Sequence, residues 1–130
     1  MAKKESRYVD GFVITVPKKN KAMYKKMAEL GRKVWLKHGA LDYKECIGDD
    51  LMPKNMGGPK SLSFIKLGKA KPSEDVWFSF IVYKSKKHRD EVNKKVMKDP
   101  LMNDPKWKDM PMPFDMKRMA YGGFKVEVSA

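Results

Sequence analysis

Two hydrophobic patterns alternate along the first part of this chain. Residues 8–16 are apolar at nearly every position, which is typical of a central strand covered on both faces, and Asp10 is the exception. Over residues 18–37 the apolar positions recur every three to four residues, which predicts an amphipathic helix. Gly39 then favours a helix end. Residues 41–47 alternate between apolar and polar side chains, as expected for a strand with one wetter face.

The second part of the chain shows the same order of elements. Residues 75–84 are the most apolar run and predict a buried strand, while 61–67 are expected to form a short strand or an edge extension. Ser85 is a suitable N-cap for a helix over residues 86–98. Residues 119–128 predict the closing strand, in which the pair Gly122-Gly123 suggests a bulge or a close backbone approach.

Two segments predict loops. Residues 48–60 are dense in Gly and Pro. Residues 99–115 contain four of the eight prolines together with Trp107, Met112 and Phe114. This second segment is too rich in Pro for a helix or strand and too apolar for a disordered tail. We therefore expect an ordered loop that lies over the domain or over a partner.

The predicted order, β-α-β-β-α-β, is that of the ferredoxin-like α+β fold, in which an antiparallel sheet carries two helices on one face. A chain of this length forms one domain over residues 1–130. The other sheet face is also predicted to be apolar. Such a face is commonly buried against a second copy, which gives a dimeric α+β barrel. The expected partner is therefore a second copy of the chain, in a homodimer.

Charge is the outlier in composition, with a formal net charge of +13. Of the 29 basic residues only Arg7, Arg32, Arg89 and Arg118 are arginines. Scattered lysines favour a solvated surface over a dedicated nucleic-acid site, and predict only weak, non-specific binding to nucleic acid. Neither a signal peptide nor a membrane span is indicated, since no apolar run approaches about 18 residues. A cytoplasmic protein is expected.

The motifs of common catalytic and cofactor sites are absent from the sequence. It contains no P-loop, no dinucleotide-binding Gly pattern and no Cys-x-x-Cys pair. Two histidines and one cysteine at separate positions predict no metal site, and we expect no cofactor. Cys46 lies in an alternating strand, which favours a half-buried structural residue over a reactive thiol.

Candidate chemistry gathers around residues 34–50 and Asp10. A carboxylate in an apolar strand costs several kcal/mol unless it is paired or hydrated. Asp10 is expected either to pair with Arg118 or Lys117, or to face a polar pocket. His38 is a candidate base or ligand contact, or alternatively a side chain that satisfies the last carbonyls of its helix.

These observations predict a single pocket. The first two strands flank the helix that carries His38 near its end, so Asp10, His38, Tyr43 and Glu45 are expected to converge there. In this hypothesis His38 or Asp10 is the base, Tyr43 donates a hydrogen bond and Glu45 orients its neighbours.

Most of the chain also resembles one family. Residues 8–14, 34–50 (beginning Val-Trp-Leu-Lys-His-Gly), 81–93, 96–100 and 112–124 resemble the YbaA-like proteins, an uncharacterised bacterial family with a domain of unknown function in the dimeric α+β barrel superfamily. The resemblance implies this fold and a homodimer. It implies no activity and assigns no catalytic residues.

Two functions remain open from the sequence. One is a small-molecule site, in a binding protein or in a cofactor-independent enzyme that acts on a small organic compound, which is an argument by analogy of fold. The other is a non-catalytic dimer that acts by interaction, including weak nucleic-acid binding through its basic surface. A cavity lined by the four candidate residues favours the first function, and lysines gathered on one face of the dimer favour the second.

Overall fold

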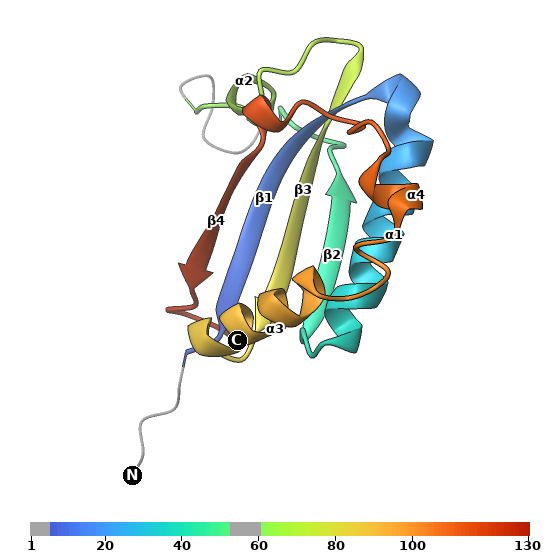
Figure 1. Ribbon diagram of the computed structural model, residues 1–130. Helices are drawn as coiled ribbons and strands as arrows, with labels where there is room; N and C mark the ends of the chain where they lie inside the picture. The colour runs from blue at the N-terminus through green and yellow to red at the C-terminus, as the bar shows by residue number, and fades with distance from the viewer. Residues whose placement is uncertain (1–5, 53–60) are drawn as a thin grey trace.

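A four-stranded antiparallel sheet organises the fold (Figure 1). The structure is a computed structural model and describes residues 6–52 and 61–130. The strands are β1 (Tyr8–Pro17), β2 (Asp42–Ile47), β3 (Glu74–Tyr83) and β4 (Ala120–Lys125), in the spatial order β2-β3-β1-β4. Each neighbouring pair is antiparallel. The prediction of an α+β fold with one antiparallel sheet is confirmed.

Two long helices cover one face of this sheet, which we call the inner face. A 3-10 turn, η1 (Lys18–Asn20), leads into α1 (Lys21–Lys37), and α3 (Lys86–Met97) begins after Ser85. Ser85 Oγ accepts the His88 backbone N–H at 3.1 Å, which confirms the predicted cap. The core lies between this face and the helices, where Val34 and Val92 pack with Ile81. No helix in the described ranges is long and apolar enough to cross a membrane.

The opposite face, the outer face, is only partly covered. A single helical turn, α2 (Phe64–Leu67), lies where a strand was expected over residues 61–67. The prediction was wrong because Ser63 Oγ accepts the Lys66 backbone N–H at 3.1 Å, a cap that favours helix over extended chain. Thr15 Oγ1 on this face donates to the Gly68 carbonyl at 2.7 Å and so holds α2 against β1.

Away from α2 the outer face exposes aromatic side chains. Phe78 is 44% exposed and Phe124 is 61% exposed. The ring of Phe64 meets Phe78 edge-on at 6.4 Å between centroids, and Phe80 follows at 6.0 Å from Phe78. The outer face therefore carries an apolar surface at the centre of the sheet.

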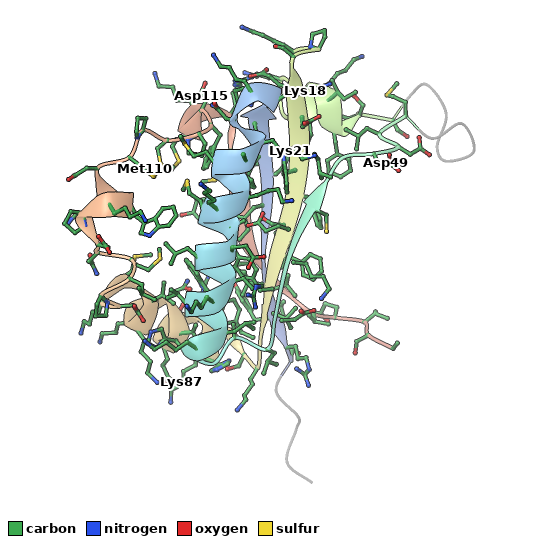
Figure 2. All side chains as sticks on the ribbon, turned by 90° about the vertical axis from the view of Figure 1, so that its right-hand side faces the viewer. Lys18, Lys21, Asp49, Lys87, Met110 and Asp115 are labelled. Atoms are coloured by element: carbon green, nitrogen blue, oxygen red, sulfur yellow. The ribbon has the colours of Figure 1, made fainter. Side chains whose placement is uncertain are left out.

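Residues 98–119, which we call the crossing segment, run from the end of α3 to the start of β4 (Figure 1). Figure 2 shows α1 with this segment on one side and the sheet on the other. The segment contains one helical turn, α4 (Pro105–Lys108), and a 3-10 turn, η3 (Met116–Arg118). We expected no helix here. Pro105 occupies the first helical position, where its missing N–H removes no bond.

Two smaller predictions have clear outcomes. The last strand is shorter at both ends than the predicted 119–128. Gly123 was expected to mark a bulge or a close backbone approach, and the second holds, because a Cβ there would collide with the Tyr8 hydroxyl. Residues 53–60 of the predicted loop lie outside the described residues.

Candidate functional site

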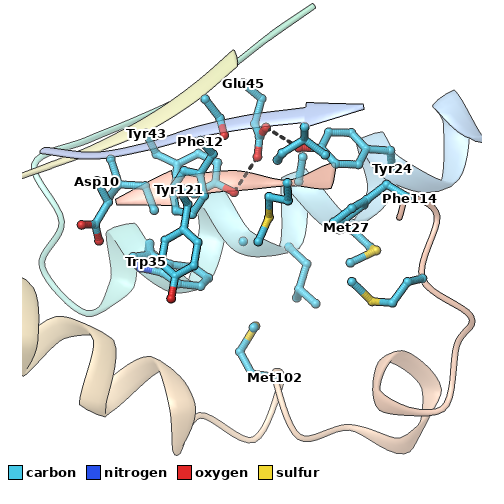
Figure 3. A pocket seen from close by; sticks show the side chains of 18 of the residues that line it. Asp10, Phe12, Tyr24, Met27, Trp35, Tyr43, Glu45, Met102, Phe114 and Tyr121 are labelled. Atoms are coloured by element: carbon cyan, nitrogen blue, oxygen red, sulfur yellow. Dashed lines mark hydrogen bonds between the residues drawn. The ribbon is translucent and has the colours of Figure 1, made fainter. Parts of the chain in front are cut away.

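A pocket of about 660 Å³ lies on the inner face, enclosed by α1, α3 and the crossing segment (Figure 3). Its floor is the sheet, with side chains from all four strands. Its far wall is the crossing segment, and Figure 3 shows Met102 across the cavity from the strands. A cavity of this size holds a small organic molecule.

Methionine dominates the apolar lining. Six methionines of the described residues line the pocket: Met27, Met97, Met102, Met112, Met116 and Met119. Aromatic rings complete it, and Phe12 stacks on Tyr121 at 5.8 Å between centroids. Methionine is unbranched and flexible, so this lining adapts to the shape of what it contacts.

Glu45 is the central polar group of the floor. Alternation along β2 directs Tyr43 and Glu45 to the inner face. The Tyr24 hydroxyl of α1 donates to Glu45 Oε1 at 2.8 Å, and the Tyr43 hydroxyl donates to Oε2 at 3.0 Å (Figure 3). Burial raises the pKa of Glu45 although both of these bonds lower it. Burial and the nearby carboxylate raise the pKa of both tyrosines, so both remain protonated donors.

Gly31 of α1 makes room for Tyr43. A Cβ at Gly31 would lie 2.5 Å from the Tyr43 hydroxyl oxygen and 3.3 Å from Cζ. Glycine normally weakens a helix interior by about 1 kcal/mol relative to alanine. Its presence is explained by this contact, because the ring of Tyr43 crosses the helix at this turn.

Asp10 is paired with Arg89 of α3. Arg89 Nη1 donates to Asp10 Oδ1 at 2.7 Å, and the two side chains are only 19% and 7% exposed. The guanidinium lies over the ring of Tyr8, with Cζ 4.9 Å from the centroid. Asp10 therefore forms an ion pair, with a partner other than the two expected, and both members of the pair line the largely apolar pocket.

The alternative partners expected for Asp10 lie elsewhere. Arg118 forms two hydrogen bonds with Glu74, at 2.8 and 2.7 Å. This pair joins η3 to the start of β3, while Asp10 lies towards the other end of β1. Arg118 therefore holds the crossing segment and leaves Asp10 to Arg89.

Asn93 supplies a further fixed polar group in the lining. Its Oδ1 accepts hydrogen bonds from Trp35 Nε1 at 3.0 Å and from the Tyr83 hydroxyl at 3.2 Å. These bonds orient Trp35, whose ring stands 6.3 Å from that of Tyr43. Helices α1 and α3 are thereby joined beside the pocket.

The structure brings Asp10, Tyr43 and Glu45 to one pocket and leaves out His38. The ring Nε2 of His38 lies 2.7 Å from Asp99 Oδ2, behind the end of α1. This correction follows from the helix end, since His38 comes directly after Lys37 and meets the chain that leaves α3 rather than the sheet. The ring also pairs with a carboxylate instead of the last helix carbonyls.

Cys46 and His88 do not line the pocket. Cys46 is exposed, against the expectation of a half-buried residue, because the edge strand β2 directs it away from the helices. His88 Nδ1 accepts the Lys84 backbone N–H at 3.0 Å. Within residues 6–52 and 61–130, no three His, Cys, Asp or Glu side chains are placed to hold a metal ion.

Sequence reasoning missed Tyr24 and Arg89. Tyr24 lies four and seven residues before the apolar positions Ala28 and Gly31 of its helix, and nothing in the sequence distinguishes its hydroxyl from a core side chain. Arg89 had a signal, since it stands three and seven residues before Val92 and Val96, on the core side of the helix. A rare arginine on an apolar stripe in a lysine-rich chain indicates a buried pair.

Comparison with known proteins places the chain in a family. Residues 7–116 match the family described as "Protein of unknown function (DUF1428)". The chain is 42% identical over 119 residues to the uncharacterized protein YbaA of Escherichia coli strain K12, covering 92% of this chain and 95% of that relative. The uncharacterized YbaA of Shigella flexneri matches to the same extent. The chain belongs to this family of unknown function and is YbaA-like, as the resemblance predicted.

Proposed function

We propose that this member of the family binds a small, largely apolar organic molecule in the inner-face pocket. The observation that carries the proposal is the composition of the pocket: a methionine-rich wall faces a floor with a few oriented polar groups. Ligand sites typically combine apolar surface with a small number of placed polar side chains. Asp10, Tyr43 and Glu45 are the polar contacts of this site.

The fold proposal follows from the strand order. We propose a ferredoxin-like sheet, and the order β2-β3-β1-β4 with two helices on one face supports it. We propose that two copies bury their outer faces against each other. Phe78 is exposed on the central strand β3, and Phe124 is exposed on the edge strand β4. The inner-face pocket then remains within each copy, on the side away from the partner.

Binding is tested with naphthalene, an apolar probe without hydrogen-bonding groups. Trp35 and Trp107 line the pocket, so occupancy changes tryptophan fluorescence and raises the Tm. Met27→Trp places a larger side chain in the cavity and is expected to weaken binding at least about tenfold, or 1.4 kcal/mol.

The matched control is Met52→Trp. Met52 is 67% exposed and is not among the described residues that line the pocket. This variant is expected to bind naphthalene as the unchanged protein does. Absence of binding to the unchanged protein, or equal binding by both variants, would show that the pocket is not the site.

A further inference from the structure

The hydrogen bonds at Glu45 determine what a ligand must offer there. A phenol has one proton to donate, and Tyr24 and Tyr43 each give theirs to this carboxylate. What remains at the floor is acceptor capacity, on the two phenol oxygens and on the remaining carboxylate lone pairs. A ligand group that completes these bonds must itself be a donor.

The neighbouring acceptor atoms are already in use. Asp10 is an acceptor and already holds Arg89. Asn93 directs its carbonyl oxygen to Trp35 and Tyr83, so it does not reach towards Glu45 as an acceptor. At the centre of the floor stands the Glu45 carboxylate, which Tyr24, Tyr43 and Ser79 contact by hydrogen bonds. The two phenol oxygens keep capacity to accept a further hydrogen bond.

We propose that Glu45 is a proton acceptor for a ligand hydroxyl group that is more acidic than that of tyrosine, carried by a compact apolar ligand such as the enol of a 1,3-dicarbonyl compound. This inference rests on the proposed binding function of the pocket. The ligand O–H bond breaks, and its proton forms a new O–H bond on a Glu45 carboxylate oxygen. The Tyr24 and Tyr43 hydroxyls turn from the carboxylate to the new ligand oxyanion. No other bond changes, so the step needs neither oxidant nor reductant.

The site is suited to this transfer on two counts. Its two donors are attached to α1 and β2 and are already within 3.0 Å of the carboxylate, so they move by rotation of a hydroxyl alone. Burial raises the pKa of Glu45 and so makes it a stronger base than an exposed glutamate. Burial also raises the pKa of both tyrosines, which therefore keep the protons that stabilise the oxyanion.

The experiment uses 2-naphthol as the probe and 2-methoxynaphthalene as its match without a donor. Excited 2-naphthol is a strong acid, and its neutral and anionic forms emit at different wavelengths. Bound to the unchanged protein, 2-naphthol is expected to emit mainly as the anion. In Glu45→Gln the anion emission is expected to fall at least about fivefold, with the Kd for 2-methoxynaphthalene unchanged within about twofold.

Two further variants separate position from charge. Glu91→Gln removes an exposed carboxylate on α3 and is expected to leave anion emission unchanged. Tyr24→Phe and Tyr43→Phe together keep the carboxylate but remove the donors to the oxyanion. That double variant is expected to reduce the 2-naphthol affinity at least about tenfold while binding 2-methoxynaphthalene as before.

The outcomes distinguish this inference from the binding proposal. If both probes bind and Glu45→Gln emits as the unchanged protein does, Glu45 is not the acceptor, although the pocket binds ligands. If neither probe binds, both the inference and the proposed function are wrong. Loss of anion emission in Glu45→Gln alone, with 2-methoxynaphthalene still bound, supports both.

Discussion

The imidazole Nε2 of His38 lies 2.7 Å from Asp99 Oδ2, and this contact joins the end of α1 to the start of the crossing segment. Asp99 is buried and also accepts the Leu101 backbone N–H at 2.8 Å and Lys37 Nζ at 3.2 Å. The bond from Leu101, followed by that from His38, lowers the pKa of Asp99 to about 2. One ionised carboxylate thus fixes one end of the wall that encloses the pocket.

We expect Asp99→Ala to lower the Tm by about 5 °C or more, because three donors lose their acceptor. Naphthalene affinity is expected to fall as well, since the crossing segment loses its attachment to α1. Thermal unfolding followed by circular dichroism measures the first effect. Asp109→Ala, at an exposed position of the same segment, is the control, and an equal loss in both variants would contradict this role for Asp99.

Removal of Arg89 is expected to leave Asp10 as a buried, unpaired charge. Arg89→Leu should lower the free energy of unfolding by about 3 kcal/mol. Adding Asp10→Asn should recover part of this loss, because the uncompensated charge is gone. Arg32→Leu, which breaks the exposed pair with Glu29, should cost less than about 1 kcal/mol. Urea unfolding of the unchanged protein, these three variants and Asp10→Asn alone provides the comparison, and additive losses from Arg89→Leu and Asp10→Asn would argue against the pair.

Gly31→Ala is expected to destabilise the protein, although alanine favours helix. The new methyl group would meet the Tyr43 hydroxyl and displace it from Glu45. In a Tyr43→Phe background the substitution should cost less, because the nearest atom is then absent. A double-mutant cycle in urea measures this coupling. If Gly31→Ala lowers the free energy of unfolding by the same amount in both backgrounds, the contact with Tyr43 does not explain the glycine.

Acid should weaken the attachment of η3 to β3. The hydrogen bonds from Arg118 lower the pKa of Glu74 to about 2, from 4.5 in the unfolded chain. A lowered folded-state pKa stabilises the protein above the unfolded value, and this contribution is lost as the pH falls from 4.5 towards 2. Glu74→Gln should therefore destabilise at pH 6 and cease to do so near pH 2. A difference that is the same at pH 6 and pH 3 would exclude the pair as the cause.

The proposed dimer is tested by its mass. Light scattering should give about twice the 15.0 kDa chain mass. Phe78→Lys places a charge on the outer face and should produce monomer. Leu36→Lys, at a position of α1 that is 39% exposed, should leave the dimer intact. A monomeric unchanged protein would require another explanation for the exposed aromatic side chains.

Local patterns predicted the strands and long helices because each element has its own hydrophobic period. Alternation along β2 was also enough to place Tyr43 and Glu45 on the same face. The Asp10–Arg89 pair could not be predicted so directly, since 79 residues separate its partners and only the folded topology joins them. The crossing segment has no regular hydrophobic period. Its turns are determined by caps, such as the hydrogen bond that the Lys106 backbone N–H donates to Asp104 Oδ1.

The wall of the pocket that the crossing segment forms is rich in methionine, and it differs in kind from the floor that the strands form. In the proposed binding function, its flexible thioethers adapt to molecules of different shape, while the side chains of the strands select the polar group of the ligand at the floor. Substitutions confined to residues 98–119 would therefore change the preferred size of the ligand and leave its chemistry alone. The same wall is vulnerable, because oxidation of the thioethers to sulfoxides would make an apolar surface polar.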